Sequence, residues 1–487
     1  MQDSIIIPHD AKIIDIILHE CKMVRFPDQE DAAIIMISEF VNELYDNKDK
    51  IPETNIVSFL LRRTVEIDEI LSAQINEILH HPDFQRLEGS WRGFHYFIMN
   101  TETGSNLKIK LLNVTLDELR TDLVKAIEFD QSNLFKKVYE EEYGTFGGTP
   151  YSCLLGDYYL SNHPQDITFL ELMSGVAAAA HAPFIASVSP LFFSLDSFED
   201  LPYPRDLTKL FESPDYVKWN SFRNSEDSRY VSLILPRVLM RLPYGDNTCP
   251  VVGFNFQEEV GVGDTSKFCW GNAVYALGQR ITNAFALYNW TAAIRGVENG
   301  GMLEGLPAYV FTTLEGDRTI KCPTEVAITD RREKELSDLG FLAVCYCKGS
   351  DYAVIFNSQT TQKPKVYNMD DANANAALSA RLTYLLAASR FAHYIKVIMR
   401  DKIGSFLTKE NIESYLNNWL SGYILLNDDA SSEIKAQYPL REGRIDVYDV
   451  PGSPGKYKSV IYLRPHFQME ELTASIRLVA TLPGKAG

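Results

Sequence analysis

The chain is short of the features that mark several common protein classes. Its seven cysteines are odd in number and scattered, with no CxxC pair. This pattern excludes a zinc-ribbon or thioredoxin-like motif and favours reduced thiols. The N-terminus has neither the basic start nor the apolar run of a signal peptide. No stretch offers the roughly 20 uninterrupted apolar residues of a membrane span. We therefore expect a cytoplasmic protein without membrane insertion.

Positive charge is also scarce. The 487 residues include 47 lysines and arginines against 65 aspartates and glutamates, for a formal net charge of −18. Such a chain repels phosphate backbones and anionic lipids, so we expect no nucleic-acid partner. Hydrophobic residues at 45% and charged residues at 23% are ordinary for a globular protein. At about 150 residues per domain, the length predicts about three domains.

Motifs for catalysis and cofactor binding are missing as well. GSPGK at residues 452–456 has the wrong spacing for a phosphate-binding loop, and GVG at residues 261–263 lacks the third glycine of a dinucleotide motif. His19 and Glu20 begin like a zinc-protease motif, but Met23 takes the place of the second histidine. We expect no catalytic residues, no metal ligands and no cofactor.

Paired acids leave one enzymatic alternative open. Glu140 to Glu142 and Glu258-Glu259 are short acidic runs, which usually form a solvated face. Two carboxylates at glycosidase spacing could still meet in a cleft of the folded chain. The alternative to a non-enzymatic protein is therefore a cytosolic hydrolase that uses paired carboxylates.

The middle of the chain alternates between helix and strand patterns. Apolar residues recur every three to four positions over residues 62–81, which predicts a helix ended by Pro82. Residues 107–113 (LKIKLLN) alternate like a strand. Thr115 and Glu118 have the spacing of a capping box that opens a helix to about residue 129. This alternation favours an α/β or mixed α+β fold.

Further elements follow in the second half. Residues 330–340 predict a helix, and FLAVCYC with YAVIF (residues 341–356) predicts a hairpin. Residues 371–400 carry the longest helical pattern, and Thr408 caps another helix that runs to residue 420. Earlier, the apolar window at residues 173–193 predicts a buried alanine-rich helix followed by a loop.

The end of the chain predicts a second hairpin. Residues 444–450 and 457–464 form two strand patterns joined by PGSPGK. An isolated hairpin is marginally stable in water, and little chain follows to cover this one. It therefore needs further strands, either from the body of the chain or from another chain by β-augmentation.

Two segments combine arginine with acidic and aromatic residues. They span residues 80–94 and 219–245, the second with Glu226 and Asp227 as nearby acids. Such arginines favour charge-paired contacts between elements or across an interface, with a phosphate-binding cluster as the alternative. The residues of this charged motif are Arg86, Glu88, Trp91, Arg92, Arg229, Arg237 and Arg241.

At these segments the sequence resembles the large contractile-sheath subunit of bacterial type VI secretion systems, the TssC, VipB or ImpC family. The matching stretches run in order from about residue 65 to residue 482. They include ILHHPDFQRLEGSWRG, SRYVSLILPRVLMRLPYG, FCWGNAVYALGQRI and YLRPHFQMEELTASIRLV. The joint occurrence of such long stretches is very specific.

The resemblance implies a structural protein, not an enzyme. Family members form an obligate heterodimer with a small sheath subunit (TssB, VipA or ImpB), which polymerises with neighbouring protomers around a tube of Hcp protein. The sheath assembles on a baseplate, contracts to propel the tube and spike, and is dismantled by a ClpV-type AAA+ ATPase. The energy of contraction would be stored as a difference between two lattice packings.

The resemblance also implies a domain plan and site residues. It implies a large multi-layer α/β body with a C-terminal hairpin completed by strands from neighbouring chains. We expect an N-terminal arm at residues 1–60, a body at 61–430 with an outer insertion within about 120–220, and a C-terminal region at 431–487. Glu470 and Glu471 would face the tube, or else form a solvated helix face. The expected strand-exchange residues are Ile5, Ile6, Ile7, Ile445, Val447, Val460 and Tyr462.

Overall fold

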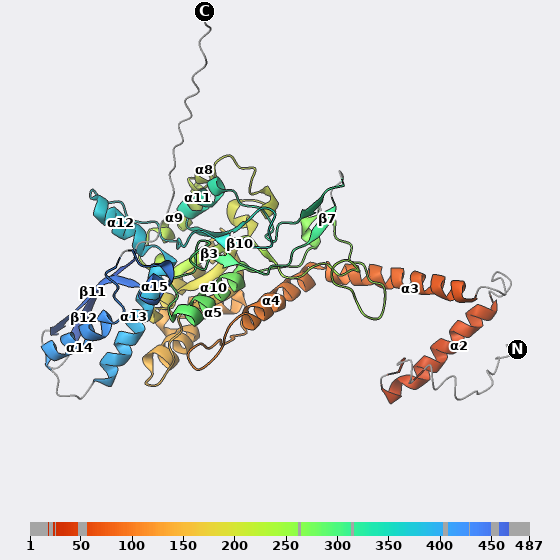
Figure 1. Cartoon of the computed structure of the whole chain (residues 1–487), viewed down its shortest axis with the longest axis horizontal. Helices are drawn as coiled ribbons and strands as arrows, with labels where there is room; N and C mark the ends of the chain where they lie inside the picture. The colour runs from red at the N-terminus through yellow and green to blue at the C-terminus, as the bar shows by residue number, and fades with distance from the viewer. Residues whose placement is uncertain are drawn as a thin grey trace, which may run out of the picture. The chain divides into compact units, whose positions relative to one another are not determined.

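The computed structural model describes residue 18 and residues 23–24, 26–46, 56–261, 264–312, 316–402, 408–427, 429–449 and 457–466 (Figure 1). The chain divides into two compact units. The first comprises residues 1–77 together with Pro250–Gln257, and the second comprises Ile78–Cys249 together with Glu258–Gly487.

The first unit is built on two helices, α2 (Glu30–Asp46) and α3 (Ile56–Leu79), preceded by the short η2 (Pro27–Gln29). An ion pair between Glu43 and Arg63 joins the two helices. The helix predicted over residues 62–81 is confirmed, and it begins earlier than expected. Several apolar side chains of α3, such as Leu61 and Ile70, are exposed, so they are not covered by the described part of this chain.

The second unit is organised around a six-stranded sheet with the strand order β1-β2-β3-β9-β10-β6. The first four strands are parallel, and β10 and β6 continue the sheet in antiparallel pairing. Their bounds are β1 Leu154–Leu160, β2 Phe184–Val188, β3 Val231–Leu235, β6 Met302–Leu303, β9 Phe341–Tyr346 and β10 Ala353–Ile355. The predicted hairpin at residues 341–356 is confirmed as β9 and β10.

Both faces of this sheet are covered, so the unit has three layers. Along β2, Phe184 and Ala186 pack into the core on the side of α7 (Pro164–Ala180), whereas Ile185 packs with α10 (Ala273–Tyr288) on the other side. Strands buried on both faces have nearly continuous apolar sequences, as in FIASV and VSLIL. The predicted α/β class is therefore confirmed.

The body contains further helices, turns and short strands. The helix after Pro82 is α4 (Pro82–Met99), where this proline is the first residue, and α5 (Leu116–Lys125) opens with the predicted capping box of Thr115 and Glu118. The other bounds are η4 Phe129–Gln131, α6 Asn133–Phe135, η5 Lys136–Gly144, η6 Pro190–Phe193, η7 Phe198–Asp200, α8 Leu207–Phe211, η8 Pro214–Tyr216, α9 Val217–Arg223, η9 Asp227–Tyr230, β4 Val238–Leu239, η10 Thr265–Lys267, β5 Trp270–Gly271, β7 Val310–Thr312, β8 Arg318–Ile320 and α11 Asp330–Asp338.

Three sequence-based predictions of local structure were wrong. Residues 107–113 form no strand, and Leu111 and Leu112 are exposed, because no neighbouring strand within the described residues pairs with them. The loop predicted after the alanine-rich helix is instead β2, which the parallel sheet buries. The long helix predicted at residues 371–400 is divided into α12 (Asp370–Ser379) and α13 (Leu382–Asp401), with extended backbone at Arg381.

The C-terminal part of the second unit packs around an aromatic cluster. Trp290, which follows α10, stacks on Phe391 of α13 with ring centroids 4.4 Å apart. Trp419 of α14 (Lys409–Ser421) contacts the same ring at 6.0 Å. The chain then forms α15 (Ser432–Gln437) and the predicted hairpin, β11 (Leu440–Asp449) with β12 (Tyr457–Pro465). This cluster fixes α13 and α14 to the body beside the hairpin.

Candidate functional site

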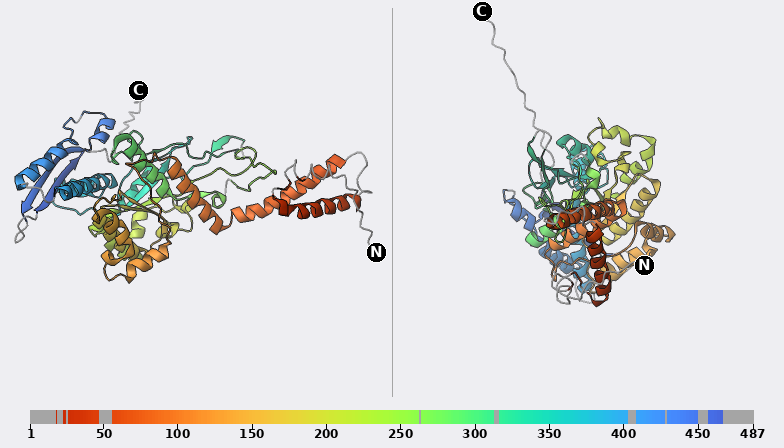
Figure 2. Two further views of the ribbon diagram at one scale, coloured as in Figure 1. Left: turned by 90° about the horizontal axis from the view of Figure 1, so that it is seen from below. Right: turned by 90° about the vertical axis from the view of Figure 1, so that its right-hand side faces the viewer.

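The C-terminal hairpin is a regular antiparallel ladder. Its register pairs Ile445 with Ile461 and Asp446 with Val460, and it continues to Asp449 opposite Tyr457. The hairpin lies beside α14 in the two directions of view (Figures 1 and 2), and α14 contacts β11. A two-stranded sheet of this length needs a packed face for stability, and α14 supplies it.

The two faces of the hairpin differ in burial. Ile445 and Val447 are fully buried and pack with Leu416 and Leu420 of α14. Val460 and Tyr462 lie on the opposite face, where Tyr462 is half exposed and carries the guanidinium of Arg444 above its ring at 5.0 Å. The side chains of Ile445 and Val447 therefore belong to the core of this chain, and only Val460 and Tyr462 lie on the outer face.

The outer edge of β11 is covered by side chains of α14. Asn417 donates through Nδ2 to the carbonyl oxygen of Ile445 (2.8 Å) and accepts from its backbone N–H through Oδ1 (3.0 Å). Glu413 accepts from the backbone N–H of Val447 at 3.1 Å. These bonds occupy the groups that an added strand would use, so α14 blocks this edge.

The outer edge of β12 is the open one within the described residues, where β12 pairs with β11 alone. Because Ile445 and Val447 direct their backbone groups away from β12, the opposite residues Ile461 and Ser459 direct theirs away from β11. The hairpin therefore presents one edge whose backbone donors and acceptors have no partner within the described residues.

A buried ionic cluster forms a second feature of interest. Arg241 is 8% exposed and contacts two carboxylates: its Nε lies 2.7 Å from Glu88 Oε1, and its Nη1 lies 2.5 Å from Glu258 Oε2. Arg92 also donates to Glu88, at 2.6 Å, and to the hydroxyl of Tyr244, at 2.8 Å. The cluster joins α4 to the segment that follows β4, where Arg241 lies, and to Glu258.

The electrostatics of this cluster favour the charged forms. Burial alone would raise the pKa of Glu88, but hydrogen bonds from Arg241 and Arg92 hold that pKa below its ordinary value. Burial would lower the pKa of Arg241, and its bonds to Glu258 and Glu88 raise it instead. A carboxylate held ionised by two arginines is a poor general acid, so the cluster does not resemble a hydrolase site.

The other members of the predicted charged motif are dispersed. Arg237 makes a bidentate pair with Glu325, at 2.8 and 2.5 Å. Arg86 is exposed and pairs with Asp83, and Trp91 is 60% exposed on α4. Arg229 donates to the backbone carbonyl of Glu226. The motif is thus one buried cluster, one separate pair and three surface residues.

Two of the acids that complete these contacts were not predicted from the sequence. Glu226 and Asp227 were the nearby acids expected for the second segment, but Glu258 and Glu325 take that role, together with Glu88, which the predicted motif included. Glu258 had been assigned to a solvated acidic run. A signal was available, since Glu88 and Glu325 both lie within apolar or arginine-rich stretches, but nothing in a single sequence pairs residues 153 positions apart.

Two groups of predicted site residues lie outside the described residues. They are Ile5, Ile6 and Ile7 of the expected linking strand, and Glu470 and Glu471 of the expected tube-facing helix. Their roles stay predictions.

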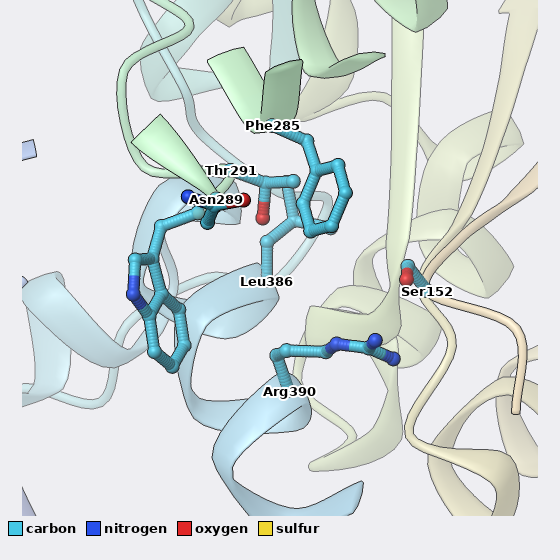
Figure 3. Close-up of a pocket in the computed structure, with 7 residues that line it drawn as sticks. Ser152, Phe285, Asn289, Thr291, Leu386 and Arg390 are labelled. Carbon is cyan, nitrogen blue, oxygen red and sulfur yellow. The ribbon is translucent and has the colours of Figure 1, made fainter. Parts of the chain in front are cut away.

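No substrate-sized cavity stands out in the part of the chain that the structure describes. The best-formed pocket has a volume of about 10 Å³, at the lower limit for one water molecule (Figure 3). The described residues contain no group of three or more histidine, cysteine or acidic side chains that could hold a metal ion. None of the described helices is long and apolar enough to cross a membrane.

The described residues thus provide an uncovered strand edge and a buried ionic cluster, and sequence comparison gives the class of the protein. Residues 62–362 match the EvpB/VC_A0108 tail sheath N-terminal domain, and residues 371–482 match the EvpB/VC_A0108 tail sheath gpW/gp25-like domain. The chain belongs to this tail sheath family, and it is a structural sheath subunit.

One sequence relative agrees with this assignment. The type VI secretion system sheath protein TssC1 of Pseudomonas aeruginosa is 48% identical over 439 residues, which cover 88% of each chain. A baseplate structure of the anti-feeding prophage matches at 12% identity and a TM-score of 0.37, over 80% of this chain and 87% of that one. The contracted helical sheath of the same particle matches at 13% identity and a TM-score of 0.29, over 64% of this chain and 66% of that one. The resemblance to the large sheath subunit of type VI secretion systems is confirmed.

Proposed function

We propose that this chain is the large subunit of a type VI secretion contractile sheath in the cytoplasm. It forms an obligate heterodimer with a small sheath subunit and polymerises into a helical tubule around an Hcp tube. The polymer assembles on a baseplate, contracts to propel the tube and spike, and is dismantled by a ClpV-type AAA+ ATPase. The observation that carries this proposal is the match to both sheath domains, supported by the 48% identical relative.

The hairpin supplies the physical basis for polymerisation. An edge strand with free backbone groups can accept a strand from another chain, which forms hydrogen bonds with little dependence on side chains. Since Asn417 and Glu413 occupy the edge of β11, we propose that the added strand binds along β12. Val460 and Tyr462 would then lie next to the side chains of the incoming strand on the outer face.

The incoming strand is proposed to come from the N-terminal arm of a neighbouring protomer or from the small subunit. The apolar run Ile5, Ile6 and Ile7 suits such a strand because these residues favour extended backbone. Glu470 and Glu471 are proposed to contact the inner tube.

We infer that the chain has no catalytic activity of its own. The buried carboxylates that could have served a hydrolase, Glu88 and Glu258, are both neutralised by Arg241. The mechanical work of contraction would come from the difference in packing between an extended and a contracted lattice. No bound nucleotide in this chain is needed for that.

Electron microscopy of the chain co-expressed with its small-subunit partner tests the proposal. Hollow tubules with cogwheel-shaped ends would support it, because they require both strand exchange and lateral contacts between protomers. A monodisperse soluble chain that binds no partner would contradict it and would reopen the search for an enzymatic cleft.

A further inference from the structure

The pocket of Figure 3 contains an arginine, Arg390, to which the described residues provide no acid. The pocket lies where the loop before β1, the end of α10 and the helix α13 meet. Ser152, Asn289 and Thr291 supply its polar side chains, and Arg390 of α13 extends toward Ser152. Ser152 and Asn289 are exposed, so the pocket opens to solvent.

Arg390 differs from other enclosed arginines of the second unit because it makes no hydrogen bond to the part of the chain that the structure describes. Arg241, Arg237 and Arg120 each pair with a carboxylate, and Arg223 and Arg280 donate to backbone carbonyls. Arg390 has no ion pair or hydrogen bond within the described residues, and its Nε is buried without a partner. A buried donor without a partner costs free energy unless something outside the chain satisfies it.

The guanidinium is also held in place. Its central carbon lies 4.6 Å from the centre of the Tyr394 ring, one turn further along α13, which restricts the plane of the group. The neighbouring cations are engaged elsewhere. Lys396 lies over the Tyr143 ring at 3.3 Å, and Arg400 donates to the Thr145 carbonyl at 2.8 Å. Arg390 is therefore a fixed positive group with donors directed at the pocket.

The lining of the pocket suits an anion. Its enclosed volume of about 10 Å³ has room for one oxygen atom. No acidic side chain lines it, so an anion meets no repulsion there. Arg390 and Ser152 together offer several donors, which suits the two oxygens of a carboxylate.

We propose that the Arg390 pocket binds an aspartate or glutamate side chain of a neighbouring copy of this chain in the assembled sheath. This inference rests on the proposed function, since it needs copies of the chain in contact. A second copy is the occupant that the observations favour, because each copy carries 65 acidic residues and an excess of negative charge. A positive pocket on an acidic protein gives such contacts a specific register.

A zero-length cross-link in assembled tubules tests the proposal directly. Arg390→Lys keeps the positive charge and introduces an amine that a carbodiimide can join to a carboxylate in contact with it. Tubules are assembled from an equal mixture of isotopically labelled and unlabelled chains, with the small subunit. We expect a peptide that joins position 390 to an acidic residue of another copy, with mixed isotope composition, and at least tenfold less of it in unassembled heterodimers.

Other results would overturn the inference. A cross-link within one chain, a cross-link to the small subunit, or tubules without any cross-link at position 390 would each do so. If Arg390→Lys prevents assembly, the unsubstituted protein is treated with an arginine-specific dicarbonyl reagent. Protection of Arg390 in tubules by about tenfold relative to heterodimers supports the pocket contact, and equal modification overturns it.

A charge-matched pair of variants separates the pocket from net charge. Arg390→Gln and Lys365→Gln each remove one positive charge, and Lys365 is exposed beside the exposed Glu226. We expect the protein concentration needed for tubules to rise about tenfold for Arg390→Gln alone, with both heterodimers melting at similar temperatures. Equal assembly of the two variants would contradict the inference. Failure of the unsubstituted protein to form tubules would instead contradict the proposed function.

Discussion

Arg241 shows how partners within the chain stabilise a buried charge. Arg241 would be costly to bury alone, but the carboxylates of Glu88 and Glu258 and the ring of Tyr244, 4.5 Å from its guanidinium carbon, surround it. Each acid is likewise paired, so the cluster is neutralised within the chain. Removal of Arg241 leaves Glu88 with Arg92 as its one arginine and leaves Glu258 without an arginine.

Arg241→Ala should destabilise the protein by about 3–5 kcal/mol, because two buried carboxylates lose their shared partner. The matched control is Arg86→Ala, since Arg86 pairs with Asp83 at the exposed surface, where such a pair contributes about 0–1 kcal/mol. Melting temperature and soluble yield of the heterodimer provide the measurement. Equal behaviour of the two variants would place Arg241 on an exposed face and contradict the structure.

A second residue-scale prediction concerns acid sensitivity. His393 is 1% exposed, and its Nε2 donates to the Ala180 carbonyl at 2.9 Å. Burial, with smaller contributions from Arg390, His181 and Lys396, lowers the pKa of His393 to about 4 from its ordinary value of 6.5. Between these values the unfolded chain binds more protons than the folded one, so stability falls as the pH drops from about 6.5 to 4.

The loss attributable to His393 should be about 2 kcal/mol between pH 7 and pH 5. Urea unfolding of the soluble complex at both pH values, compared with His393→Gln, isolates it from the titration of carboxylates. The variant should lose less stability on acidification than the unsubstituted protein. The same loss in both would show that His393 does not titrate in this range.

At the scale of elements, α4 depends on close approach to its neighbours. A Cβ at Gly89 would overlap the carbonyl oxygen of Trp270, and one at Gly93 would overlap the ring of Tyr275 on α10. The spacing of four residues puts both glycines on one face of α4, next to Glu88. Small residues at these two positions therefore let α4 lie against β5 and α10 and bring Glu88 within reach of Arg241.

Gly89→Ala should lower stability by about 1–3 kcal/mol despite the better helix propensity of alanine, because the overlapping atom belongs to rigid backbone. Gly104→Ala is the control, since nothing lies within 4 Å of a Cβ there. Thermal unfolding of both variants is the measurement. A neutral Gly89→Ala would mean that α4 lies further from β5 than the structure shows.

The hairpin is the element on which assembly should depend. Ser459 directs its backbone N–H toward the open edge of β12, opposite Val447 in the register. Ser459→Pro removes that donor without removing a hydrogen bond of the β11–β12 ladder. We expect folded heterodimers that no longer form tubules by electron microscopy.

Ser459→Ala keeps the backbone donor and should assemble normally, which makes it the matched control. Normal tubules from Ser459→Pro would show that strand addition uses another edge. In that case Asn417→Ala, which uncovers the edge of β11, would become the next variant to examine.

At the scale of the whole molecule, the chain combines a closed α/β body with surfaces left for partners. The sheet is covered on both faces, and its apolar side chains are largely buried. By contrast, α3 exposes apolar side chains, and β12 exposes an edge. A covered core beside uncovered surfaces suits the proposed sheath polymer, in which the lattice would change while each core keeps one packing.

Deletion of residues 1–20 tests the arm at this scale. The deletion removes the proposed linking strand but leaves the β-sheet core intact, so folded heterodimers should accumulate without tubules. Size-exclusion chromatography and electron microscopy together give the result. Full-length tubules from the truncated chain would contradict the assignment of the linking strand to this arm.

Local patterns predicted much of the fold. The capping box at Thr115, the helix α11 and both hairpins were predictable because adjacent side chains and turns favour them. The strand predicted at residues 107–113 failed because alternation alone supplies no neighbouring strand. The break at Arg381 was missed because it depends on pairing with Gln359, which the sequence pattern does not show.

The sequence by itself determined the α/β class, the family and the presence of a C-terminal hairpin, since these depend on local periodicity and long matching stretches. Only the tertiary structure decided which acids pair with Arg241, which edge of the hairpin the described residues leave open, and that the Nε of Arg390 has no hydrogen-bond partner among them. Those features join residues far apart in the chain, and their energies come from burial and distance, which exist only once the chain has folded.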